Sequence, residues 1–537
     1  METLGAFIDA AARDFGGRPA LLTAEEQVTY ADLARHAERL AAGLARLGVA
    51  TGTHVGLLMP NRPEWLACAF AVFRLGAILV PLNTLHRRAE LEYALRHADV
   101  NVLITVDRFL NHAYVDLLRQ IVPEIAAAAP PIVSAALPAL REVVVAGAAG
   151  GGAIRALDHV RADGTAMAGG LGAVQAGVAP SDPAAIFFTS GTTAAPKGAV
   201  HTHASMLYAA RNVADCLGLT ADDRTWGYLP FFFTGGLVAV ALATLSRGGA
   251  VLLQEVFDPG ATLKLMAEHH CTTLFAWPHQ AEALIAHPEF AATPLALRKG
   301  VGANTAWAAH LYPPDHQAVG TWGMTETGPM ATSSRFDDPL PVRAGAHGRP
   351  MPGLDMRIID PNTGTPLPVG QDGELVVRGA SVMAHYYKMT PADCFDADGY
   401  FHSGDLARVD AAGCLHFLGR FKDVIKTAGV NVAAAEVEAV LQDHPGVTLA
   451  CVVGVPHPAR GESIAAFVVR RDPGCSEDDL LAFCRARLAS YKVPQHVFFC
   501  SEADLPVLGS GKVDKGALRA LAVERLLPSP FPSRECR

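Results

Sequence analysis

This sequence has few charged residues, no paired cysteines and no long apolar run, and each absence argues against a class of protein. Charged side chains make up 18% of the 537 residues, which argues against a mostly disordered chain. The ten cysteines include no CxxC pair, so neither a zinc ribbon nor a disulfide framework is indicated. No uninterrupted apolar run reaches the roughly 18 residues that a membrane span needs. Residues 1–15 lack the basic start and apolar core of a signal peptide, so we expect a soluble cytoplasmic protein.

Basic runs interleaved with aromatic residues are also missing. The formal net charge is −9 at pH 7 and the pI is about 6.2, which argues against nucleic acid as a partner. Half of the residues are apolar and the chain is too long for one core, so we expect roughly two to four domains. The sequence leaves the oligomeric state open, a homodimer included.

The most informative stretch is residues 189–198, Thr-Ser-Gly-Thr-Thr-Ala-Ala-Pro-Lys-Gly, which follows an apolar run that predicts a strand. Glycines let backbone N–H groups turn toward an anion, and hydroxyls and a lysine add donors and charge. The stretch is not a Walker A loop, because Pro196 precedes Lys197 and Gly198 follows it. We predict a phosphate-binding loop; a flexible polar turn is the alternative. Its predicted phosphate contacts are Thr189, Ser190, Gly191, Thr192, Thr193 and Lys197.

The order of predicted elements indicates several units. Residues 1–110 alternate strand and helix patterns, which predicts a parallel sheet covered by helices. Residues 112–180 gather alanine and glycine; part is helical, 143–145 is a candidate strand, and the remainder predicts a mobile surface connection. Residues 340–420 are β-rich and punctuated by glycine and proline. A smaller α+β unit of about a hundred residues follows.

Four stretches after the loop complete a set: Trp322–Glu326, Ser403–Asp405, Gly419–Gly429 and Gly509–Lys512. In order and spacing, the loop and these stretches resemble the AMP-forming acyl-CoA synthetases of the adenylate-forming superfamily, over nearly the whole chain. The resemblance implies an α/β fold. Its large N-terminal domain would hold stacked parallel-type sheets with helices and a β-rich subdomain, and its small C-terminal α+β domain would be mobile. The boundaries we expect are 1–419 for the adenylation domain, 420–422 for the hinge and 423–537 for the mobile domain.

The resemblance also implies a two-step reaction. A carboxylate attacks the α-phosphate of ATP to give an acyl-adenylate and pyrophosphate, and a thiol, usually that of CoA, then displaces AMP. The implied cofactors and partners are ATP, Mg²⁺, CoA and a small carboxylic acid. Because an anion attacks a highly charged triphosphate, the site must supply cations and preorganised donors.

Residue by residue, the resemblance implies a catalytic set. Lys512 matches the adenylation lysine, Thr325 a donor to the α-phosphate, and Glu326 a magnesium ligand, which suits the preference of magnesium for one or two carboxylates. Trp322 would stack on adenine, and Asp405 would accept from the ribose hydroxyls. The alternatives without a catalytic role are that Trp322 is a core residue, Asp405 a turn former and Lys512 a solvated surface lysine. The other implied nucleotide contacts are Gly302, Ala303, Asn304, Thr321, Gly323 and Arg420.

For the second step the resemblance implies a rotation of the small domain. Lys422 matches the hinge position, although a lysine there could be ordinary surface. Rotation would withdraw Lys512 and bring in the face that holds Thr427, Ala428 and Gly429, which are the predicted CoA-binding residues.

The acid pocket of relatives maps onto an aromatic and apolar set. Phe233 stands where acyl- and aryl-CoA synthetases commonly carry histidine, and Trp277 is bulky where small aliphatic residues are frequent. No lysine or arginine belongs to the set, which favours an apolar monocarboxylate, such as a medium-chain fatty acid or a compact cyclic or aryl acid. The predicted pocket residues are Phe232, Phe233, Thr234, Leu237, Trp277, Gly328 and Met330.

Two other functions stay open at this stage. A free-standing adenylating enzyme would load a carrier-protein phosphopantetheine instead of CoA. A nucleotide-binding protein without turnover is the second alternative, because three positions depart from the pattern. These are Ala194, where relatives usually carry glycine, Gly320, where they often carry Asn or Gln, and Phe233.

Overall fold

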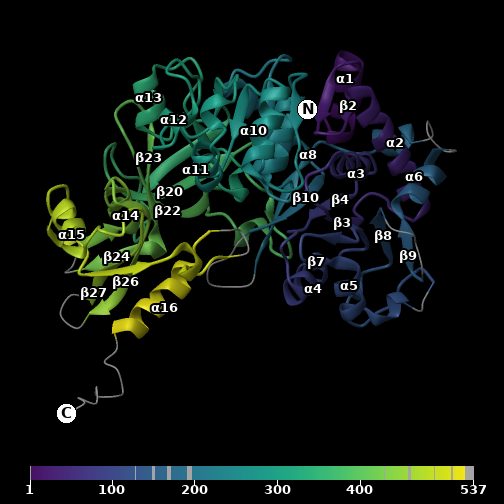
Figure 1. The fold of residues 1–537 in the computed structure, drawn as a ribbon. Coiled ribbons are helices and arrows are strands. Elements are labelled where there is room, and N and C mark those ends of the chain that lie inside the picture. The colour runs from purple at the N-terminus through teal and green to yellow at the C-terminus, as the bar shows by residue number, and fades with distance from the viewer. Residues whose placement is uncertain are drawn as a thin grey trace, which may run out of the picture.

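Figure 1 shows the computed structural model, in which the two sheet-rich parts of the first 300 residues lie side by side and the yellow C-terminal unit lies at one edge. The structure describes residues 2–126, 129–147, 152–165, 171–189, 196–427, 430–457, 461–488, 490–508 and 512–526. None of the helices in these ranges is long and apolar enough to cross a bilayer.

An eight-stranded sheet forms the centre of the N-terminal part, with the strand order β21-β11-β10-β4-β3-β5-β8-β9. From β10 to β9 the neighbouring strands are parallel, and β3, β5 and β8 are buried at every position, as expected for a sheet covered on both faces. The strands are β3 (His54–Leu58), β4 (Ile78–Pro81), β5 (Val102–Val106), β8 (Glu142–Ala146), β9 (Ile154–Ala156), β10 (Pro183–Phe188), β11 (Gly198–Thr202) and β21 (His385–Tyr386).

A second sheet has six strands in the order β15-β14-β12-β13-β1-β2, and all but β2 run parallel. Successive residues of β1 point to opposite faces of the sheet. Leu21 packs in the main core, and Leu22 packs in the second cluster, which α10, α11 and α12 cover. The strands are β1 (Pro19–Leu22), β2 (Gln27–Thr29), β12 (Arg224–Gly227), β13 (Ala250–Leu252), β14 (Thr273–Phe275) and β15 (Lys299–Gly300).

Apolar helix faces and an all-apolar helix close the main core. The π-helix Gly235–Leu242 is apolar on every side and buried among the other helices, as expected for a helix without a polar face. Helices of this part are α1 (Leu4–Phe15), α2 (Tyr30–Arg46), α3 (Pro63–Arg74), α4 (Arg88–His97), α5 (Tyr114–Ile121), α8 (His203–Cys216), α10 (Pro259–Glu268), α11 (Pro278–Ala286) and α12 (Ala308–Leu311).

Within residues 112–180 the candidate strand 143–145 is confirmed as part of β8 and helix occurs as expected, but the prediction of a mobile surface connection is wrong for β9. β8 and β9 extend the eight-stranded sheet, and α6 (Leu157–Thr165) packs against α2. A side chain at Gly164 of α6 would overlap the carbonyl oxygen of Arg39 of α2, and one at Gly43 of α2 would overlap the carbonyl oxygen of Val160. The small residues that gave this part the composition of a linker therefore permit close helix packing instead.

The β-rich subdomain holds two small antiparallel sheets. The four-stranded sheet has the order β19-β20-β22-β23, and the three-stranded sheet has the order β16-β17-β18. Their strands are β16 (Thr321–Trp322), β17 (Thr332–Ser333), β18 (Arg349–Pro350), β19 (Leu354–Ile359), β20 (Gly373–Gly379), β22 (Phe401–Val409) and β23 (Leu415–Arg420).

The C-terminal unit has a sheet and a hydrophobic cluster of its own. β23 ends at Arg420 and the first strand of this unit begins at Val424, with the 3₁₀ turn Phe421–Asp423 between them. The domain boundaries stated above stay a prediction. Its strands are β24 (Val424–Thr427), β25 (Val430–Ala433), β26 (Val447–His457), β27 (Gly461–Arg470) and β28 (His496–Cys500), and its helices are α14 (Ala434–Gln442), α15 (Glu477–Arg485) and α16 (Lys515–Leu526).

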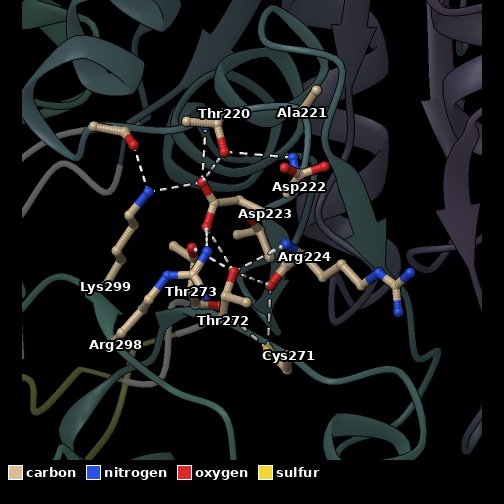
Figure 2. Close-up of polar contacts among 12 residues, drawn as sticks. Thr220, Ala221, Asp222, Asp223, Arg224, Cys271, Thr272, Thr273, Arg298 and Lys299 are labelled. Carbon is tan, nitrogen blue, oxygen red and sulfur yellow. Dashed lines mark hydrogen bonds and ion pairs between the residues drawn. The ribbon is translucent and has the colours of Figure 1, made fainter.

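A buried carboxylate holds the amino edge of the six-stranded sheet together (Figure 2). Asp223 is fully buried and lies 2.7 Å from Lys299 Nζ and 2.9 Å from Arg298 Nη2. The hydroxyl of Thr272 and the backbone N–H of Thr220 also donate to it. Burial alone would raise the pKa of Asp223, but these donors and the Lys299 charge hold it below its usual value.

Replacing Asp223 should therefore destabilise the protein strongly. Asp223→Ala leaves the buried ammonium of Lys299 without its carboxylate, so we expect a loss of about 3–5 kcal/mol in unfolding free energy, measured by urea denaturation. Asp222→Ala is the matched control, because the Asp222 side chain is 85% exposed and, within the described part of the chain, its one ion pair is with Arg18 at the surface. Similar urea midpoints for the two variants would contradict the role given to Asp223.

Candidate active site

The predicted phosphate-binding loop connects two paired strands. β10 and β11 form an antiparallel pair that ends at Phe188 and Gly198, and Thr189 closes it by donating its N–H to the Lys197 carbonyl oxygen at 2.8 Å. Ser190, Gly191, Thr192 and Thr193 lie outside the described residues, as does Ala194. The structure thus fixes the two ends of the loop, and its phosphate contacts stay a prediction.

Tyr386 links this loop to the predicted magnesium ligand. The Lys197 ammonium lies 4.8 Å from the centroid of the Tyr386 ring, within the range of a cation–π interaction. The Tyr386 hydroxyl donates to Glu326 Oε1 at 2.8 Å. The sequence gave no sign of this residue, because its place depends on the pairing of β21 with β11, where Tyr386 lies opposite Ala199.

The surroundings of Glu326 suit a cation. Glu326 is buried, and no described residue donates to its second carboxylate oxygen. Burial, together with the negative charge of Glu326, raises the pKa of Tyr386, which therefore stays a protonated donor. A buried carboxylate with one free oxygen fits magnesium, which takes few protein ligands and completes its shell with water and phosphate oxygens.

His201 holds the backbone of the same segment. Its Nε2 lies 2.9 Å from the Thr325 carbonyl oxygen, and its Nδ1 lies 3.4 Å from Ser205 Oγ. Burial lowers the pKa of His201 to about 4, so the ring is neutral near pH 7 and Nε2–H is the donor to Thr325. Thr325 and Glu326 are thus held on the 3₁₀ turn Thr325–Thr327 by a histidine that sequence reasoning missed.

Asp405 lies at the centre of a second polar group. The Trp322 indole N–H donates to Oδ2 at 2.9 Å, and Arg420 Nε lies 2.8 Å from Oδ1. The sequence suggested a turn, but Asp405 lies within β22 opposite Arg420 of β23, next to a register shift in the strand pair. Only 2% of Asp405 is exposed, and this burial raises its pKa to about 6 against the opposing effects of Arg420 and Trp322.

Lys512 of the C-terminal unit belongs to the same charge group. The residue is exposed overall, yet protein around its ammonium group desolvates it and lowers its pKa. The positive charge of Arg420 lowers that pKa further, and the negative charge of Asp405 opposes both effects. The structure therefore brings Lys512 within electrostatic reach of Asp405 and Arg420, 92 residues after Arg420 in the sequence.

The predicted adenine contacts lie beside this group. Trp322 packs in the hydrophobic cluster of the β-rich subdomain and is 7% exposed. Thr321 donates its hydroxyl to the Thr332 carbonyl oxygen at 2.7 Å, and Gly323 is exposed after β16. Most of the Trp322 ring thus faces protein, and the predicted stacking on adenine stays a prediction.

Two backbone N–H groups of the turn after β15 already donate hydrogen bonds within the protein. The N–H groups of Gly302 and Ala303 both donate to the Val319 carbonyl oxygen, and Asn304 follows them, half-buried. An adenine amine is a donor, so carbonyl oxygens of this turn would be its acceptors, while the two occupied N–H groups would not take part. A side chain at Gly320 would overlap the carbonyl oxygen of Ala346, which explains why no Asn or Gln stands there.

Comparisons with known proteins agree with this arrangement. A family model described as "AMP-binding enzyme" matches residues 8–387, and one described as "AMP-binding enzyme C-terminal domain" matches residues 436–512. The feruloyl-CoA synthase of an Amycolatopsis species is 36% identical, over 92% of this chain and 93% of that protein. The sulfoacetate–CoA ligase of Cupriavidus necator is 33% identical, over 96% and 97%. The crystal structure of the anthranilate CoA ligase AuaEII in complex with anthranoyl-AMP has a TM-score of 0.85 at 25% identity and covers 98% of each chain.

The chain belongs to the AMP-binding enzyme family. It is an AMP-forming acid–CoA ligase. Enzymes of this kind use ATP and CoA as substrates together with a carboxylic acid. The fold confirms the α/β prediction, with a large N-terminal part and a small C-terminal domain. Of the functions that the sequence left open, these similarities support the acyl-CoA synthetase.

In the ligase, three aromatic side chains of the predicted acid pocket lie together. The Phe232 and Phe233 ring centroids are 4.5 Å apart, and Phe233 and Trp277 are 6.3 Å apart, edge to face. His279, which the sequence did not suggest, lies 5.8 Å from Trp277. Phe233 and Trp277 are half-buried, so this aromatic wall is partly open to solvent.

The remaining predicted pocket residues of the ligase are more enclosed. Leu237 of the π-helix and Met330 pack in the main core, and Thr234 is 3% exposed. Gly328 is buried at the end of the 3₁₀ turn that carries Thr325. The structure thus brings the aromatic members of the set together and buries these four.

The predicted hinge and CoA residues are described only in part. Lys422 lies in the 3₁₀ turn between β23 and β24. Thr427 ends β24 fully buried, and its hydroxyl has no hydrogen-bond partner among the described residues. Ala428 and Gly429 lie outside the described residues, so the CoA contacts of the ligase stay a prediction.

The indole donor to Asp405 can be tested by titration. Trp322→Phe removes one donor to the carboxylate, so we expect the pKa of Asp405 to rise above about 6. Selective ¹³C labelling of aspartate and NMR titration would measure it. Trp277→Phe is the matched control and should leave that pKa unchanged; an unshifted Asp405 in Trp322→Phe would contradict the contact.

Proposed function

We propose that this ligase activates an apolar monocarboxylic acid, either a medium-chain fatty acid or a compact cyclic or aryl acid, and transfers its acyl group to CoA. The observation that carries the proposal is the aromatic wall of Phe232, Phe233 and Trp277. A second negative charge on the acid would need a cation there, and no predicted pocket residue carries one. The feruloyl-CoA synthase and the anthranilate CoA ligase bear names of aryl acids, in line with such a wall.

For the first step we assign roles to the polar groups. Lys512 bridges the attacking carboxylate and the α-phosphate, to which Thr325 also donates. Asp405 accepts from the ribose hydroxyls, and Arg420 contacts ribose and phosphate. The contacts of Asp405 with Trp322 and Arg420 support this assignment, because they leave a preorganised carboxylate beside the lysine. The phosphate loop with Lys197 holds the β- and γ-phosphates.

Glu326 is the residue that we assign to magnesium. Bound there, the ion would neutralise part of the triphosphate charge. Tyr386 orients the carboxylate by its hydrogen bond to Oε1, and His201 fixes the backbone through Thr325. These contacts leave Oε2 of Glu326 without a donor among the described residues, so this oxygen is the one that we assign to the ion.

For the second step we propose a rotation of domain 423–537 about the hinge 420–422, at Lys422. The movement withdraws Lys512 from the domain 1–419 and brings in Thr427, Ala428 and Gly429 to line the path of the CoA thiol. The short connection between β23 and β24 supports a hinge at this place.

The reaction itself is tested with a panel of acids. With ATP, magnesium and CoA, we expect sustained release of AMP and pyrophosphate with medium-chain fatty or aryl monocarboxylates. A clear preference for a dicarboxylate or an amino acid would overturn the substrate class. Turnover with a carrier-protein phosphopantetheine and none with CoA would overturn the acceptor.

The role of Lys512 separates the two half-reactions. Lys512→Ala should slow acyl-adenylate formation by about 100-fold or more, because a donor to the developing charge is lost. Thioester formation from supplied acyl-adenylate should continue at the wild-type rate. Lys515→Ala is the matched control, since Lys515 pairs with Glu438 within the small domain. Equal loss in both half-reactions would contradict the withdrawal of Lys512.

A further inference from the structure

A cavity lies at the amino edge of the six-stranded sheet. Its volume is about 470 Å³, within the roughly 300–1,000 Å³ of small-molecule sites. The chain segments that line it come from the start of β1, the turn before β12, and the loops before β14 and β15. No residue of the predicted active site belongs to its lining.

The cavity and the candidate active site occupy opposite ends of the same strands. β12 and β15 begin at the cavity, with Arg224 and Lys299 as their first residues. Phe233 follows the carboxyl end of β12, Trp277 that of β14 and Ala303 that of β15. Because these strands are parallel, a ligand in the cavity would lie at their amino ends, and the nucleotide and the acid would lie at their carboxyl ends.

Three arginines from separate segments line the cavity, and their charges are only partly balanced. Arg18 pairs with Asp222, which is 85% exposed. Arg298 shares Asp223 with the buried ammonium of Lys299, so that carboxylate is already neutralised. Arg18, Arg298 and Lys299 thus contribute three positive charges, and Asp222 and Asp223 contribute two negative charges.

The third arginine, Arg224, adds an unbalanced charge. Its guanidinium points away from Asp223 in Figure 2 and donates Nη1 to the His269 carbonyl oxygen at 2.8 Å. Among the described residues no carboxylate pairs with it. The lining of the cavity therefore carries a surplus of positive charge.

The guanidinium groups also keep free donors. Among the described residues, Arg18 and Arg298 each make their hydrogen bonds through Nη2 alone, and Arg224 makes its through Nη1 alone. A guanidinium carries five N–H donors in a rigid fork, so most of those around the cavity are left for a ligand. Asp223, held by Thr220, Thr272 and Lys299, in turn holds one side of the half-exposed Arg298 guanidinium.

We propose that this cavity binds a phosphate-bearing anion. The surplus positive charge selects an anion, and forked guanidinium donors match the oxygens of a phosphate group. Pro19, Ala221, Ala250 and Ala296 supply apolar lining for an uncharged part of the ligand. The site is separate from the catalytic centre, so its occupancy does not require turnover.

The test titrates inorganic phosphate into the full-length ligase by calorimetry. The active site is first saturated with magnesium and α,β-methylene ATP, so that phosphate meets a filled triphosphate site. We expect one phosphate to bind the wild-type protein and Arg224→Gln to weaken that binding at least tenfold. Arg119→Gln is the matched control, because Arg119 is a half-exposed arginine on α5 that pairs with Asp116.

Two results would overturn the proposal: no phosphate binding to the wild-type protein at millimolar concentrations, or equal affinity in Arg224→Gln. Arg18→Gln provides a second variant if Arg224→Gln does not fold, and it should weaken phosphate binding likewise. Every titration is made with the active site already filled. A negative result would therefore contradict the anion site and leave the proposed acid-activating function unaffected.

Discussion

Asp405 brings together residues from three parts of the chain that lie far apart in sequence. Trp322 donates to it from the three-stranded sheet, Arg420 pairs with it from the neighbouring strand, and the charge of Lys512 in the C-terminal domain acts on it electrostatically. A carboxylate that is 2% exposed is costly to ionise, and its pKa of about 6 reflects that cost. The charges of Arg420 and Lys512 favour the ionised form, so the ionisation of Asp405 depends in part on where the C-terminal unit holds Lys512.

A second linked group holds the side of the site that faces the phosphate loop. Lys197, Tyr386 and Glu326 are connected by a cation–π contact and a hydrogen bond, and His201 fixes the backbone next to Glu326. His201 lies on β11, Lys197 directly precedes it and Tyr386 lies on its edge partner β21, whereas Glu326 lies on the 3₁₀ turn that these residues contact. The two short paired strands thus fix the direction of the side chains that hold Glu326.

Much of the fold could be predicted from the sequence because its elements are long and strongly patterned. The alternating strand and helix patterns of residues 1–110 predicted a parallel sheet covered by helices, and the structure has α2, β3, β4 and β5 there. The ordered motifs located Asp405 and Lys512, but local pattern placed Asp405 in a turn, since Gly-Asp favours turns when pairing is unknown. Tyr386 and His201 have no local signal, because their roles arise from contacts across 60 and 124 residues. Alanine and glycine in residues 112–180 gave the composition of a linker where they serve close packing, as at Gly164, whose side chain would overlap the carbonyl oxygen of Arg39.

The central claim is that Lys512 lies in the charge group of Asp405 and Arg420 before the acid is activated. Competitive labelling of lysines across a pH series, read by mass spectrometry, measures the pKa of Lys512 directly. We predict a pKa below that of a lysine in a short peptide, and protection of Lys512 from labelling by a non-hydrolysable acyl-adenylate analogue. A Lys512 that titrates like the peptide and stays equally reactive with the analogue bound would contradict the account.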